Sequence, residues 1–287
     1  MTQKLTLPAQ TAIGGVTLQV SDLAAALAFY RDLIGLEAIR LADARANLGA
    51  GGTAFLRLEE LRGAAPQPPN TTGLYHTAIR FPDRRSLAVK IGQLAQQQIP
   101  LGQGDHWVSE AFYLDDPDGN GVELYRDRPR SEWQYSGAAV QMGTDPIDLE
   151  GFFAELGEDD PAALSFAAPA ATRIGHMHLR VADLDASQRF YCDLLGFDLQ
   201  ARLGGALFVS AGGYHHHLGM NVWQTRGASP PAQPCCGMRE FSLRLPAPAD
   251  LERLAAYLAD AGLPLERGDG AFIIHDPASI RIRLEAG

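Results

Sequence analysis

Histidines in the second half of the sequence are the side chains best suited to hold a metal. His176 and His178 lie two residues apart, and a run of three, His215, His216 and His217, follows further along the chain. Imidazoles are common ligands of first-row divalent metals. The run is internal, so it is no purification tag. We therefore interpret it as part of a metal site, with an exposed polar strand edge as the alternative.

Strand geometry separates these histidines into faces. If the run belongs to a strand, side-chain alternation places His215 and His217 on one face and His216 on the other. By the same rule His178 shares a face with His176, which favours a role in lining a pocket or core. Asp22 and Asp183 look like catalytic carboxylates, but each precedes a helical pattern, so we expect them to be N-caps.

The composition of the chain narrows its class. It has 287 residues, 46% hydrophobic and 20% charged, which is typical of a globular protein. The formal net charge of −10 disfavours nucleic-acid binding, which depends on basic side chains. No stretch approaches the roughly 20 apolar residues of a membrane span, and the start lacks a secretory signal pattern. The three cysteines show no CxxC spacing. We expect a cytoplasmic protein with no membrane partner.

The sequence repeats itself at a constant offset. IGGVTLQVSDLAAALAFYRDLIGL, from Ile13, corresponds to IGHMHLRVADLDASQRFYCDLLGF, from Ile174. A second pair of segments begins at Gly73 and Gly237, and each runs on to an Asp-Pro dipeptide. The repeat divides the chain into halves at 10–128 and 172–287, joined by a linker at 129–171.

Each half contains two units of the same predicted secondary structure. Alternating apolar residues at 16–20 predict a strand, and apolar residues at helical spacing over 23–34 predict a helix that ends at Gly35. Strands are predicted around 38–41, 44–48 and 53–58. A second unit follows, with a helix at 86–97 and a last strand at 122–125. The fold class is therefore α+β, with four βαβββ units paired into two halves.

A doubled βαβββ unit with these motifs resembles the vicinal-oxygen-chelate superfamily. The motifs are the opening I-G-x-x-x-L-x-V-x-D-L and the helix end F-Y-x-D-L-L/I-G-L/F. Glyoxalase I, extradiol dioxygenases, fosfomycin-resistance proteins and bleomycin-binding proteins belong to this superfamily. DPDGNGVELY in the first half and GGYHHHLGMNVW in the second make the chain similar to the two-half catechol 2,3-dioxygenase-like group. The resemblance implies glyoxalase-like halves with cupped mixed sheets.

The resemblance also implies where a metal is held, because the superfamily takes its ligands from the first and last strands of its units. In the second half this gives His176, His217 and Glu240, with His216 in place of His217 if the register slips by one. His215 is then expected beside the metal as an acid/base or supporting group. Arg283 stands where the characterised enzymes carry a glutamate.

The first half is expected to be a degenerate structural partner. Gly15 stands at the position of His176, and only His76 and Glu123 remain at ligand positions. Two histidines and one carboxylate in the second half form the set that suits non-haem Fe(II), with Mn, Ni or Zn as alternatives.

Three functions follow from the resemblance. The first is a metal-dependent extradiol dioxygenase that cleaves a catechol-like aromatic compound with dioxygen. The second is a glyoxalase- or isomerase-like metalloenzyme, and the third is a non-enzymatic small-molecule binding (resistance) protein. A homodimer is expected by analogy with relatives that pair through sheet edges.

Overall fold

The computed structural model describes residues 5–137 and 139–287, which form four βαβββ units in chain order. Unit 1 consists of β1 (Ala12–Val20), α1 (Leu23–Leu27), β2 (Glu37–Ala42), β3 (Arg45–Ala50) and β4 (Thr53–Glu60). Unit 2 consists of β5 (Gly73–Arg80), α2 (Arg84–Gln96), β6 (Gly102–Asp105), β7 (Ser109–Asp115) and β8 (Gly121–Asp127).

The second half repeats this order. Unit 3 consists of β11 (Arg173–Arg180), α4 (Leu184–Gln188), β12 (Asp198–Leu203), β13 (Ala206–Ser210) and β14 (Leu218–Asn221). Unit 4 consists of β15 (Gly237–Leu245), α5 (Pro248–Asp260), β16 (Glu266–Gly268), β17 (Ala271–His275) and β18 (Arg281–Ala286). The α+β class and the four predicted units are confirmed.

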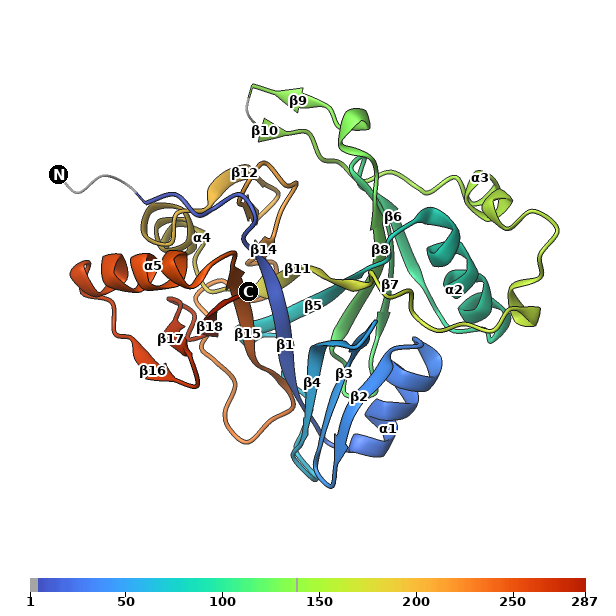
Figure 1. Cartoon of the computed structure of the whole chain (residues 1–287), viewed down its shortest axis with the longest axis horizontal. Helices are drawn as coiled ribbons and strands as arrows, with labels where there is room; N and C mark the ends of the chain where they lie inside the picture. The colour runs from blue at the N-terminus through green and yellow to red at the C-terminus, as the bar shows by residue number, and fades with distance from the viewer. Residues whose placement is uncertain (1–4, 138) are drawn as a thin grey trace.

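The units pair across the two halves rather than within them. One eight-stranded sheet has the order β16-β17-β18-β15-β1-β4-β3-β2 and joins units 4 and 1. The other has the order β12-β13-β14-β11-β5-β8-β7-β6 and joins units 3 and 2. The antiparallel pairs β1–β15 and β5–β11 make these joins, and Figure 1 shows β5 beside β11 near the centre of the molecule.

The helix starts follow the sequence signals. The Asp22 carboxylate accepts hydrogen bonds from the backbone N–H groups of Ala24 and Ala25, and Asp183 does the same for Asp185 and Ala186. The two aspartates are therefore helix caps, as predicted.

The tyrosine of the Phe-Tyr motif in each repeat forms a hydrogen bond with the next unit. After α1 and α4 the chain continues as a π-helical turn, Ala28–Leu33 and Arg189–Leu194. The Tyr30 hydroxyl donates to Asp116 Oδ2 at 2.9 Å, and the Tyr191 hydroxyl donates to Asp276 Oδ2 at 3.0 Å. All four side chains are buried. The shared Asp-Pro turns thus receive the tyrosines of the preceding units.

The connection between the halves packs against the helix α2 of unit 2. It contains the short strands β9 (Tyr135–Ser136) and β10 (Ala139–Val140), the helix α3 (Leu149–Phe153), and single 3₁₀ turns at Arg130–Glu132, Ala154–Leu156 and Pro161–Ala163. The Gln93 amide of α2 donates to the carbonyls of Pro161 and Leu164. Figure 1 shows α3 beside α2. Within the described ranges, no helix is long and apolar enough to cross a membrane.

Candidate metal centre

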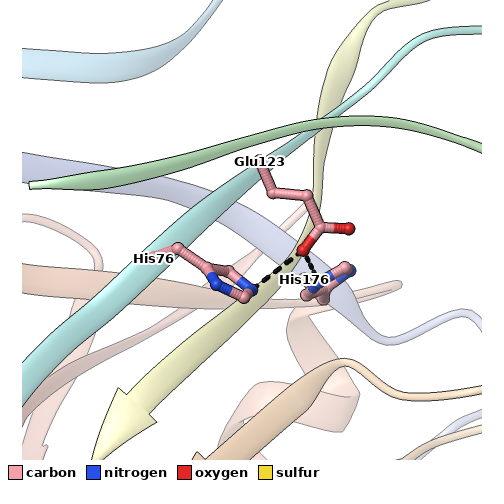
Figure 2. Close-up of side chains that lie close together, drawn as sticks. All are labelled: His76, Glu123 and His176. Carbon is pink, nitrogen blue, oxygen red and sulfur yellow. Dashed lines mark hydrogen bonds and ion pairs between the residues drawn. The ribbon is translucent and has the colours of Figure 1, made fainter. Parts of the chain in front are cut away.

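Three side chains from three adjacent strands converge at the centre of the second sheet. His76 lies on β5, Glu123 on β8 and His176 on β11, so the site takes residues from both halves. Glu123 Oε2 lies 2.9 Å from His76 Nε2 and 3.2 Å from His176 Nε2 (Figure 2). One ligand atom from each residue lies within 4.8 Å of the others. Two imidazoles and one carboxylate in this arrangement can hold a divalent metal.

Strand register explains why these residues meet. Glu123 pairs with Ala78 of β5, and Ala78 pairs with His176 of β11, so the three lie on one rung of the sheet. The small Ala78 side chain leaves room above it. His76, two residues before Ala78, reaches into the same space. Glu123 and His176 can therefore approach each other across β5, because only the small side chain of Ala78 lies between them.

The electrostatics of the site favour an ionised Glu123 beside a neutral His176. Burial acts to raise the pKa of Glu123, but the adjacent His176 and His76 outweigh it and hold that pKa well below its usual range. Burial lowers the pKa of His176, and the nearby Glu123 offsets this only in part. A carboxylate and neutral imidazoles are the protonation states that bind a metal.

Two buried nitrogens in the cluster are left without proper hydrogen bonds. Among the described residues, His76 Nε2 and His176 Nδ1 have no hydrogen-bond partner, although His76 Nε2 lies 2.9 Å from the carboxylate. Buried polar atoms are normally satisfied. An orphaned imidazole nitrogen aimed at a carboxylate oxygen fits a cation between them, so the residues present suit a metal.

The structure does not bring the expected ligands His217 and Glu240 together with His176. Glu240 lies on β15 in the other sheet, where its carboxylate accepts a hydrogen bond from Arg281 Nε at 2.9 Å. His217 Nδ1 accepts the backbone N–H of Ala211 at 3.1 Å, and burial lowers the pKa of His217 to about 3. His217 thus bonds a backbone N–H group, and Glu240 forms a partly buried ion pair with Arg281.

The histidine run does not alternate as a strand, because it lies before β14 starts at Leu218. His216 lines the cavity, and its ring centroid lies 4.2 Å from that of His176. His215 lies behind it, fully buried, with Nδ1 at 2.8 Å from His216 Nδ1. His216, and not His215, therefore lies beside the cluster at the cavity wall.

A network of hydrogen bonds, partly buried, extends from His215 away from the cavity. His215 Nε2 lies 2.8 Å from Asp127 Oδ1, and Arg80 and the Tyr214 hydroxyl also donate to this carboxylate. Burial acts to raise the pKa of Asp127, but the hydrogen bond from His215 and the charge of Arg80 outweigh it and lower that pKa. Asp127 is therefore an anion that fixes the orientation of His215.

On the opposite side, Tyr113 and His106 line the cavity together. His106 Nδ1 donates to the carbonyl oxygen of Gly143 at 3.0 Å, so in the neutral ring Nε2 accepts the Tyr113 hydroxyl proton at 2.6 Å. Burial and the nearby Glu123 raise the pKa of Tyr113 well above its usual value. Tyr113 is therefore a protonated hydrogen-bond donor at the site.

The cavity that contains the cluster has a volume of about 630 Å³. Residues 142–144 of the connection between the halves form part of its wall. The segment interpreted from the sequence as a linker thus helps to build the site. His178 also lines the cavity, as the alternation rule predicts.

A glyoxalase-like arrangement of βαβββ units around a buried His-Glu-His cluster defines a class of metal-binding proteins, and the comparisons agree with it. The profile of the Glyoxalase/Bleomycin resistance protein/Dioxygenase superfamily matches residues 12–124 and 173–284. The chain belongs to this superfamily, as its resemblance predicts.

Two relatives illustrate the likeness in sequence and in fold. The chain is 42% identical over 274 residues to "Catechol-2,3-dioxygenase" of Bacillus subtilis (strain 168), covering 94% of this chain and 95% of that protein. Glyoxalase I from Zea mays shares the fold, with a TM-score of 0.56 at 16% identity over 96% of this chain and 92% of that one.

Proposed function

We propose that this chain is a metal-dependent extradiol dioxygenase that uses Fe(II) to cleave a catechol-type aromatic ring with dioxygen. The observation that carries the proposal is the buried His76–Glu123–His176 set at the wall of a large cavity. Two histidines and one carboxylate with open positions are the ligands of non-haem Fe(II) oxygenases. The Bacillus relative, which matches almost end to end, supports the choice of reaction.

The three ligands supply one anion and two neutral donors. When bound, Fe(II) supplies Lewis acidity and open coordination positions for two adjacent hydroxyls and for dioxygen. Glu123 is 2% exposed, so water does not compete with a metal for its carboxylate. The cluster would therefore hold a cation at the cavity wall, where a dihydroxylated ring could reach it.

His216 is the group best placed to take a proton from a substrate hydroxyl. The Asp127 carboxylate accepts the Nε2 proton of His215, so His215 Nδ1 accepts the Nδ1 proton of His216. This leaves the lone pair of His216 on Nε2. Burial lowers the pKa of His216 well below its usual value, so the ring is neutral at physiological pH and can act as a base.

Asp127 and His215 are positioning residues in this scheme, because they fix the tautomer of His216 without lining the cavity. Tyr113 acts from the other side. Its protonated hydroxyl can turn from His106 to donate a hydrogen bond to a bound oxygen atom. The site thus has a base and a donor on opposite walls.

The test is oxygen uptake with catechol by the full chain, loaded anaerobically with Fe(II). We expect uptake with concurrent formation of a ring-opened product, and we expect His176→Ala to abolish both. His275→Ala is the control, because His275 is exposed on β17 of the other sheet. Absence of uptake by the iron-loaded protein across a panel of catechols would refute the proposal.

A further inference from the structure

The cavity is larger and more apolar than a single dihydroxylated ring requires. Cavities of about 630 Å³ hold drug-sized ligands. Beyond the metal cluster, its wall includes the apolar residues Val108, Leu114, Met142, Leu203, Phe208 and Trp223. Leu203 and Trp223 remain 58% and 51% exposed, so they lie where the cavity opens to solvent.

Aromatic rings form a continuous wall from the cluster to this opening. His178 lies 5.9 Å from Phe208 and 5.6 Å from Trp223 between ring centroids. Tyr75 contacts Trp223 edge-on at 5.3 Å. The Trp223 indole N–H donates to the carbonyl oxygen of Gly204 at 2.7 Å, so its polar atom is satisfied and its rings are free for apolar contact.

The cavity wall carries no fixed positive charge. Among the residues that the structure describes, no arginine or lysine lines it, whereas the acidic Asp115 does. Arg180 lies on β11 two residues beyond His178, but it donates to the carbonyl oxygen of Pro69 and is not part of the wall. A carboxylate on the substrate would lose water here without gaining a partner.

We infer that the substrate is a catechol that carries an uncharged, apolar substituent, either an alkyl chain or a second ring. Its two hydroxyls face the cluster, and its substituent lies on Leu203, Phe208 and Trp223. This inference rests on the proposed function, because it names the substrate class of the same site. Exposed apolar surface next to a cavity is the expected mark of such a contact.

The experiment compares a butyl-substituted catechol with dihydroxyphenylpropionate, which has a chain of similar length that ends in a carboxylate. With the iron-loaded full chain, we expect kcat/KM to favour the butyl compound by at least about tenfold, since apolar pockets discriminate on this scale. Leu203→Arg should shift the ratio toward the carboxylate by about tenfold. Leu41→Arg is the matched control, because Leu41 is 53% exposed on β2 of the other sheet and should leave the ratio unchanged.

Binding is measured separately, by quenching of tryptophan fluorescence under anaerobic conditions, so that the two proposals can fail independently. Tighter binding of the butyl compound without any oxygen uptake would refute the dioxygenase and leave the substrate class standing. Uptake with equal or better use of the carboxylate would overturn the substrate class. If Arg180→Ala then removed that carboxylate preference, Arg180 would be its partner. Binding of neither compound would also overturn the inference.

Discussion

Replacing Asp127 with asparagine tests whether a remote carboxylate sets the tautomer of the base. Asp127 accepts hydrogen bonds from His215 at 2.8 Å, from Tyr214 at 2.9 Å and from Arg80 at 2.9 Å. An asparagine amide at 127 can donate to His215 Nε2, which forces the ring proton onto Nδ1. His215 then donates to His216 Nδ1, and the His216 proton moves to Nε2, where the lone pair is needed.

The expected loss follows from the size of general-base catalysis. Removing a positioned base costs about a hundredfold to ten-thousandfold in rate. We expect kcat for catechol to fall within that range in Asp127→Asn, with a much smaller change in KM, because Asp127 does not line the cavity. The rate should recover partly as pH rises, since hydroxide takes over proton removal.

The assay is steady-state oxygen uptake, with the iron content of each preparation measured alongside. Asp105→Asn is the control, because the Asp105 side chain is 20% exposed and ion-paired with Arg128, much as that of Asp127 is 19% exposed and paired with Arg80. A kcat for Asp127→Asn within about threefold of wild type, at equal iron content, would refute the relay, since loss of a positioned base lowers the rate by at least about a hundredfold.

Three further results are expected. In Gly175→Ala the new Cβ would clash with the Tyr125 hydroxyl, so thermal unfolding should show a loss of about 1–3 kcal/mol, whereas Gly268→Ala, with open space around it, should show little change. Burial raises the pKa of Asp276 from 3.8 to about 6, so the contribution of this group to stability is fully present below about pH 4 and is lost as pH rises through 6; Asp276→Asn should flatten this decline, by at most about 3 kcal/mol, in denaturant titrations. Removing the metal with a chelator should lower the melting temperature of the wild type, and no shift on adding Fe(II) back would argue against a bound ion.

The repeat, the four units and the helix caps were predictable because each depends on local signals. Apolar alternation, helical spacing and an aspartate before each helix act over a few residues, and Asp22 caps its helix as its position indicates. Which units share a sheet is not a local property. All four first strands have similar apolar patterns, so the sequence does not say whether β5 joins β1 of its own half or β11 of the other half.

That missing information accounts for the difference between the expected ligand set and the cluster in the structure. The sequence places His76, Glu123 and His176 at ligand positions, but it assigns them to different halves. The antiparallel pairing of β5 with β11 brings them onto adjacent strands. The sequence already indicated that the two halves complement each other. The first half keeps only two ligand positions, and the second half lacks the glutamate of the last strand.

The histidine run was misassigned for a different reason. Alternation applies only within a strand, and residues 214–217 lie in the turn that leads into β14. His216 therefore reaches the cavity, and His215 contacts the partly buried Asp127. A glycine pair at 212–213, both with positive φ, lies one residue before the run and was a usable signal for a turn.

One metal held by residues from both halves of the chain is the proposal that iron content tests most directly. Purified His76→Ala and Glu240→Gln are each loaded anaerobically with Fe(II), desalted and analysed for iron per chain. We predict that His76→Ala loses the iron and that Glu240→Gln keeps the wild-type amount. Iron retained by His76→Ala and lost from Glu240→Gln would contradict the account and return the site to the second half alone.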